Sequence, residues 1–125
     1  MLAVCGIVRK NDRILMCKRP AGVQFQGAWE LPTETLEGDA SAEDSLEMAF
    51  FDRLTAKIQT LRPVGALDWH LNDDYRLLAY DVTLQKNFFH IYGYDDFRWV
   101  KIRDLGRLRV LKPHVTLLTG LNHEL

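Results

Sequence analysis

The chain has 125 residues, 47% of them hydrophobic, which is enough to bury one core and too little for two, so we expect a single domain over residues 1–125. Its 16 basic and 17 acidic residues leave a net charge of -1, and there are no long like-charge runs. The chain therefore lacks the broad positive electrostatic field that would bind nucleic acid or an anionic membrane. No apolar run approaches the roughly 20 residues of a transmembrane helix. The short apolar start lacks a cleavage-type site, so we expect a cytoplasmic protein.

The N-terminal part predicts a β-hairpin. Two β-rich runs, 2–9 and 13–19, flank the turn residues at 10–12. Cys5 and Cys17 therefore lie on neighbouring strands, although not directly opposite each other. Their spacing is not that of a metal or redox site, so we expect two reduced core thiols.

The next segment predicts a short strand, a loop and a helix. Residues 29–31 are extended and end at Pro32, and 33–40 read as a polar loop containing Gly38. Ser41 is a natural N-cap, with Asp44 three residues later, so a helix should run over 42–54.

The remaining pattern predicts more strands and a closing helix. Alternating apolar residues and turn residues indicate strands at 58–69, 75–84, 88–92 and 98–102, with a turn at 72–74 and a helix at 113–121 that has Pro in its first turn. A mixed sheet of this kind needs helices on both faces to be buried. The predicted class is therefore α+β, with a mixed β-sheet sandwiched between helices (α/β/α).

Three runs resemble the Nudix hydrolases of the MutT-like kind. They are RILMCKRPAG at 13–22, GAWELP at 27–32, and RWVKIRDL at 98–105. The resemblance extends over nearly the whole chain in the correct order, and it implies the Nudix fold. It also implies a magnesium-dependent hydrolase of nucleoside diphosphate-linked substrates, provided that the family's metal ligands are present.

The segment 29–56 has the layout of the family's Nudix box, but most of its acidic positions are replaced. The family's box runs Gly, Glu, Arg-Glu, Glu-Glu, Gly. With Pro32 on the family's proline, those positions hold Glu34, Ala40, Met48-Ala49, Asp52-Arg53 and Thr55. Of the acidic positions, Asp52 alone keeps a carboxylate, on a stem shorter by one methylene.

This substitution pattern predicts a degenerate metal site. Magnesium needs well-placed oxygen ligands, and the helix face that should supply them reads Ala49, Asp52, Arg53. A fixed cation there repels a divalent ion, by about 4 kcal/mol per unit-charge pair at about 4 Å. A slipped set of carboxylates, Glu43, Asp44 and Glu47, has suitable spacing, but the apolar stripe of the helix places these residues on its solvated side.

Arg53 falls inside the apolar stripe and needs a partner, because a buried unpaired charge is costly. In one interpretation it pairs with a carboxylate from the preceding strand and loop: Glu30, Glu34 or Glu37. In the other, its guanidinium takes the place of the metal and holds a phosphate or carboxylate directly.

Further binding candidates each have a plain alternative. Arg19 could contact phosphates, or it is an exposed strand end. Trp29, together with Trp69 and Tyr75, could stack a base, or these rings pack in the core. His70 lies beside the turn at 72–74, and together they could be a metal cluster. A polar hairpin tip is the favoured interpretation.

The sequence leaves two predictions of function open. The first is a Nudix-fold protein without standard hydrolysis, and without a cofactor, that binds a nucleotide-like or other diphosphate-like small molecule, or a protein partner. The alternative is a Mg²⁺-dependent hydrolase that uses a rearranged set, Asp52 as metal ligand with Glu34, Glu37 and the loop at 95–96. Neither involves nucleic acid or a membrane, and whether the chain forms a homodimer stays open.

Overall fold

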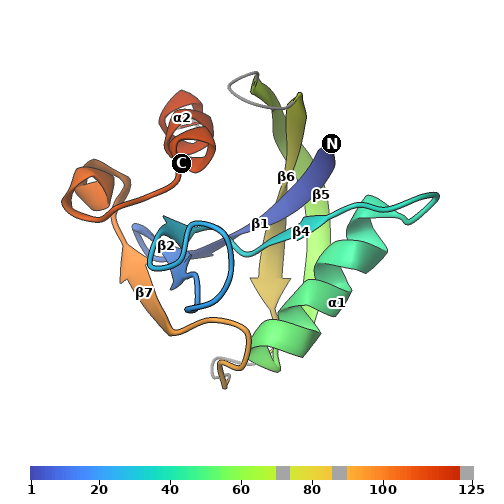
Figure 1. The fold of residues 1–125 in the computed structure, drawn as a ribbon, viewed down its shortest axis with the longest axis horizontal. Coiled ribbons are helices and arrows are strands. Elements are labelled where there is room, and N and C mark those ends of the chain that lie inside the picture. Colours follow the sequence, from blue (N-terminus) through green and yellow to red (C-terminus); the bar gives the residue numbers. More distant parts are fainter. Residues whose placement is uncertain (70–73, 86–89, 122–125) are drawn as a thin grey trace.

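The computed structural model describes residues 1–69, 74–85 and 90–121 (Figure 1). Its elements, in chain order, are β1 (Leu2–Lys10), β2 (Arg13–Lys18), β3 (Trp29–Glu30), β4 (Thr33–Thr35), α1 (Ala42–Leu54), β5 (Ile58–Trp69), β6 (Tyr75–Leu84), β7 (Asp96–Val100), a 3-10 helix η1 (Ile102–Arg107) and α2 (Lys112–Gly120).

The sheet is mixed, as predicted, and is organised around β1. The strand order is β3-β2-β1-β6-β5, with β4 paired to β1 and β7 to β2. β1 runs parallel to β6 and antiparallel to β2 and β4. Residues 3–8 of β1 are all buried, which is the pattern of a strand covered on both faces.

The two helices cover opposite faces of this strand. Cys5 and Ile7 belong to one apolar cluster, which α2 completes with Leu117 and Leu118. Val4 and Val8 belong to the other, which α1 completes with Leu46, Phe50 and Leu54. In Figure 1, α1 and α2 accordingly lie on either side of β1. The predicted α/β/α arrangement is confirmed.

The contact between β1 and α1 depends on a glycine. A Cβ added to Gly6 would lie 2.7 Å from Cε2 of Phe50, so a larger residue would push the helix away from the strand. The two thiols are free and buried, as predicted. They belong to different apolar clusters, Cys5 on the α2 side and Cys17 on the α1 side.

The bounds of α1 match the prediction, and Oγ of Ser41 accepts from the backbone N–H of Asp44 at 3.2 Å. Three other predictions need correction. Residues 33–35 were expected in a loop but form β4, because their backbone pairs with β1. The strand expected at 98–102 is β7, which starts at Asp96 and ends at Val100 before η1. Residues 90–92 of the expected strand 88–92 are not extended into a strand.

Some predictions fall on positions outside the described residues. These are residues 88 and 89, His70, and most of the turn at 72–74. Among the helices of the described segments, none is long and apolar enough to cross a membrane.

Candidate functional site

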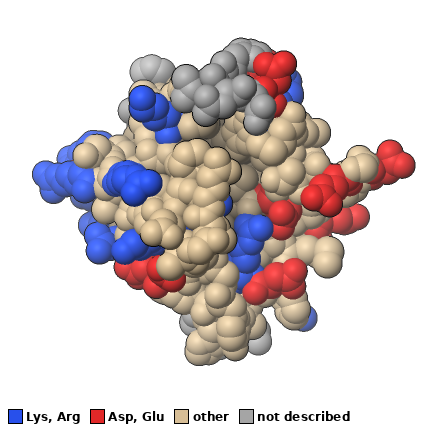
Figure 2. Space-filling model, viewed as in Figure 1, with Lys and Arg blue, Asp and Glu red and all other residues tan. Residues whose placement is uncertain are grey.

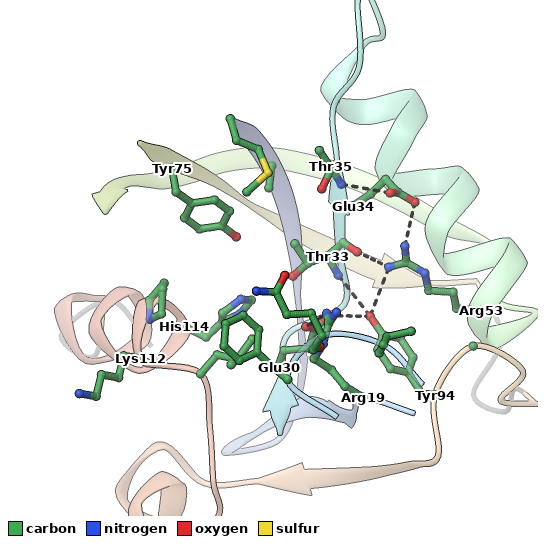
Figure 3. A pocket seen from close by; sticks show the side chains of 18 of the residues that line it. Arg19, Glu30, Thr33, Glu34, Thr35, Arg53, Tyr75, Tyr94, Lys112 and His114 are labelled. Atoms are coloured by element: carbon green, nitrogen blue, oxygen red, sulfur yellow. Dashed lines mark hydrogen bonds and ion pairs between the residues drawn. The ribbon is translucent and has the colours of Figure 1, made fainter. Parts of the chain in front are cut away.

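A cavity of about 570 Å³ opens between β4, the C-terminal end of α1, the loop after β2 and the start of α2. The face of the molecule in Figure 2 shows a recess near its centre, where basic and acidic atoms lie next to each other. Figure 3 shows the lining side chains, which include Arg19, Glu30, Glu34, Arg53, Tyr75 and His114.

A buried ion pair forms the floor of the cavity. Nη1 of Arg19 lies 2.7 Å from Oε1 of Glu30, and the Glu30 side chain is 2% exposed. The other carboxylate oxygen of Glu30 accepts a hydrogen bond from the hydroxyl of Tyr94 at 3.0 Å. Nε of Arg19 donates to the carbonyl of Gln24 at 2.7 Å. Both oxygens of the buried carboxylate therefore have partners, which burial of a charge requires.

A second ion pair lies beside the first. Nη2 of Arg53 is 2.9 Å from Oε2 of Glu34, and Nη1 donates to the carbonyl of Thr33 and, at 3.4 Å, to the hydroxyl of Tyr94. The ion pair predicted for Arg53 is thus formed with Glu34. Because Tyr94 contacts Glu30 as well, it joins the two pairs in one hydrogen-bonded chain (Figure 3).

The loop after residue 90 fixes the stem of Arg53. The backbone N–H groups of Tyr92 and Gly93 donate to the carbonyl of Arg53 at 2.7 and 3.2 Å. A Cβ added to Gly93 would lie 2.6 Å from Cγ of Arg53. The arginine side chain therefore passes close over a glycine, and a larger residue there would displace it.

Burial sets the protonation states around the floor. It raises the pKa of Glu30, while the nearby Arg19 lowers it. Burial, followed by the Glu30 charge, raises the pKa of Tyr94 well above its usual range, so its hydroxyl stays protonated and can donate. Burial likewise raises the pKa of Tyr75, on the opposite wall, to about 12.

His114 contributes a neutral ring to the cavity wall. Burial, together with the positive charge of Arg19, lowers the pKa of His114 to about 3. Its Nδ1 accepts from the backbone N–H of Leu31 at 3.2 Å. In the neutral ring the proton is therefore on Nε2.

The residues of α1 do not fit a magnesium site. Arg53 lines the cavity, whereas Asp52 is exposed and lies outside its lining, and Ala49 is buried. Glu43, Asp44 and Glu47 are exposed on the helix. Within the described residues, no group of three or more His, Cys, Asp or Glu side chains is placed to hold a metal ion. Magnesium coordination needs well-placed oxygens, and the α1 residue that lines the cavity is Arg53.

The structure brings together some of the predicted site residues and separates others. Arg19, Glu34 and Arg53 line one cavity, and Glu37 and Asp52 are exposed outside its lining. Trp29 is 5% exposed, in the core, and the guanidinium of Arg98 lies 5.0 Å from its ring centroid.

Sequence reasoning missed Tyr94 and His114. Tyr94 gave no signal, because it lies in an irregular segment. A weak signal was present for His114, since it falls on the same helical stripe as the buried Leu117 and Leu118.

The fold and the cavity define a class: a helix-covered mixed sheet with a charged cleft at one end of its longer helix. The NUDIX domain family matches residues 3–120 of the chain, and the chain belongs to this family. No curated protein sequence matches the chain significantly.

Solved structures of low sequence identity share the fold. MutT protein from Methanosarcina mazei Go1 is 15% identical, with a TM-score of 0.86, covering 99% of this chain and 94% of that one. The NUDIX domain of Shewanella oneidensis NrtR, complexed with ADP ribose, is 17% identical, with a TM-score of 0.72 and coverage of 99% and 87%. A bifunctional NMN adenylyltransferase/ADP ribose pyrophosphatase from Francisella tularensis, complexed with AMP and a Mn ion, is 18% identical, with a TM-score of 0.76 and coverage of 98% and 41%.

Proposed function

We propose that this NUDIX-domain protein lacks the family's standard metal-dependent hydrolysis. In its place, the cavity binds a nucleotide-like or other diphosphate-containing small molecule through Arg53 and Arg19, without a divalent cation. The observation that carries the proposal is that Arg53 lines the cavity. In the register set by Pro32, this position corresponds to a glutamate of the family's box.

Charge and shape support an anionic ligand with a flat ring. Arg19, Arg53 and Lys112 line the cavity with the two carboxylates of Glu30 and Glu34, and Glu30 is already bound to Arg19 and Tyr94. Trp69, Tyr75 and Phe25 lie in the same lining. Guanidinium groups suit phosphate oxygens, and aromatic faces suit a base.

Two structures of the same fold, solved with bound ligands, also support a nucleotide-like ligand. The solved NUDIX domain of NrtR holds ADP ribose, and the Francisella enzyme holds AMP with a Mn ion. Both ligands carry phosphate and a nucleoside. The difference proposed for this chain is that an arginine supplies the positive charge that a metal would otherwise supply.

Calorimetric titration of ADP ribose and ADP tests the proposal, with the protein either in EDTA or in excess magnesium. We expect binding in EDTA that magnesium does not strengthen. Arg53→Gln should weaken it by about tenfold or more, the effect of losing a charged hydrogen bond. Arg103→Gln is the matched control, because Arg103 is exposed on η1 and does not line the cavity.

Hydrolysis is the second readout. Incubating the protein with a panel of nucleoside diphosphate-linked compounds and magnesium should release no phosphate or nucleotide above the rate without protein. Robust magnesium-dependent turnover that Asp52→Ala abolishes would overturn the proposal in favour of a hydrolase with rearranged carboxylates.

The register of the box can be tested by restoring its acidic positions. The double variant Ala49→Glu with Arg53→Glu restores carboxylates at two acidic positions of the box, of which position 53 lines the cavity, and should gain magnesium affinity, measured by calorimetry. A folded double variant without such a gain would count against the assignment of Arg53 to a former metal-ligand position.

A further inference from the structure

The two terminal nitrogens of the Arg53 guanidinium have partners of different kinds. Nη1 contacts neutral oxygens, the carbonyl of Thr33 and the hydroxyl of Tyr94, and Tyr94 is 6% exposed. Nη2 contacts the carboxylate of Glu34, whose side chain is 36% exposed. One nitrogen is therefore held by the folded framework, and the other by a side chain at the rim of the cavity.

Glu34 can leave this position without disturbing the fold. Its second carboxylate oxygen accepts from the backbone N–H of the next residue, Thr35, at 3.0 Å. That is a local contact on an exposed residue, which water can replace. A partly exposed ion pair of this type contributes little to stability. By contrast, Glu30 is 2% exposed and has partners on both oxygens.

The geometry points to Glu34 as an internal competitor for Arg53. Its carboxylate occupies the place at Nη2 that an oxygen of an anionic ligand would take, so binding is an exchange in which the ligand displaces Glu34. This inference rests on the proposed function, because it concerns the same anion-binding site. The inference adds two points to the proposed function. The ligand exchanges with Glu34 at Nη2 of Arg53, and Glu34 lowers the affinity for the anionic ligand.

The direction in which Glu34→Gln changes the anion affinity distinguishes this competing role from a structural role. If Glu34 competes, Glu34→Gln removes the competing charge and the repulsion felt by an incoming anion, so affinity rises. If Glu34 instead holds Arg53 in its working position, the same change lets the guanidinium move and affinity falls. Glutamine keeps the size of the side chain, so packing is not altered.

The closing experiment uses inorganic phosphate and pyrophosphate as probes, titrated into the full chain by calorimetry in EDTA at low salt. We expect Glu34→Gln to raise the affinity for both by about threefold to tenfold, with the larger gain for pyrophosphate, because repulsion by Glu34 grows with ligand charge. Glu37→Gln is the matched control. It changes the net charge equally, on an exposed residue two positions after the end of β4 that does not line the cavity.

The outcomes separate this inference from the proposed function. Binding that depends on Arg53 but is unchanged or weakened in Glu34→Gln overturns the inference alone. Binding by Glu34→Gln and not by the native chain supports the inference and overturns the proposed function of the native protein. If neither protein binds either anion, both fail. In the Arg53→Gln background, adding Glu34→Gln should give no gain, and a gain there would also overturn the inference.

Discussion

The two arginine–glutamate pairs of the cavity have the same chemistry and different surroundings. In the first, Glu30 is 2% exposed and Arg19 is 27% exposed. In the second, Glu34 is 36% exposed and Arg53 is 29% exposed. The carboxylate therefore makes the difference: one lies in the core and the other lies at the rim.

The pair at the rim is the one that a ligand can replace. Removing one member of a buried pair leaves an uncompensated charge or polar group in the core. In a partly exposed pair, water can replace either partner, so separating the two side chains costs little free energy. The same residue types can therefore form a fixed contact in one pair and a replaceable contact in the other, and the hydroxyl of Tyr94 joins the two pairs.

The largest expected effect comes from removing the two carboxylates in turn. Glu30→Ala should lower the free energy of unfolding by about 3 kcal/mol, because Arg19 and Tyr94 lose their buried partner. Glu34→Ala should lower it by less than about 1 kcal/mol. Urea unfolding of the two variants measures both values. Equal losses would contradict the distinction between framework and replaceable contact.

The second effect is a pH dependence of the free energy of unfolding that comes from the buried His114. Its folded-state pKa is about 3 against an ordinary value of 6.5. Between these values the unfolded chain binds more protons, so stability falls as the pH falls from about 6.5, by up to about 1.4 kcal/mol per pH unit.

The check on His114 is a comparison with His114→Gln. Between about pH 6.5 and about pH 4.5 the native chain should lose about 2 kcal/mol more than the variant, measured by urea unfolding. Parallel pH profiles for the two proteins would mean that His114 is protonated in the folded state, and hence that the Nδ1 contact with Leu31 does not hold in solution.

Much of the fold was predictable, because it rests on local patterns. The N-cap at Ser41 and the apolar stripe ending at Leu54 fix the bounds of α1. The β-rich runs at 2–9 and 13–19, with turn residues between them, predict the hairpin that β1 and β2 form. β4 was missed because residues 33–35 are polar, and their strand conformation comes from pairing with β1, some 30 positions away in the chain.

The site was less predictable, because its partners are distant in sequence. The predicted replacement of acidic box positions indicates Arg53 as a site residue, and Glu34 is one of its three predicted partners. Glu30, however, is joined to Arg19 across 11 residues and to Tyr94 across 64. Nothing in the local sequence around Tyr94 indicates that its hydroxyl lies between two ion pairs, since only the folded chain brings these segments together.

A third test concerns that hydroxyl. Tyr94→Phe should lower the free energy of unfolding by about 1.5 kcal/mol, because one oxygen of Glu30 loses its donor in the core. Tyr92→Phe is the control, since Tyr92 is 77% exposed and its substitution should have no effect. Thermal unfolding of both variants measures the difference. If Tyr94→Phe is as stable as the native chain, the two pairs are not joined through this group.

The smallest effect is a gain in stability at the end of α1, two residues after Arg53. Thr55 has φ 51 and ψ 32, in the left-handed region, and its N–H caps the helix. A β-branched residue is strained there, whereas glycine is not, so Thr55→Gly should stabilise the fold by about 1 kcal/mol.

Asn11→Gly is the matched control for Thr55→Gly. Asn11 also has a left-handed φ, of 58, but asparagine tolerates this conformation, so its replacement should gain less, as urea unfolding would show. Anion affinity should be unchanged in Thr55→Gly, because the carbonyl of Arg53 is held separately by the N–H groups of Tyr92 and Gly93. A change in affinity would mean that the helix end, and not this loop, positions the guanidinium.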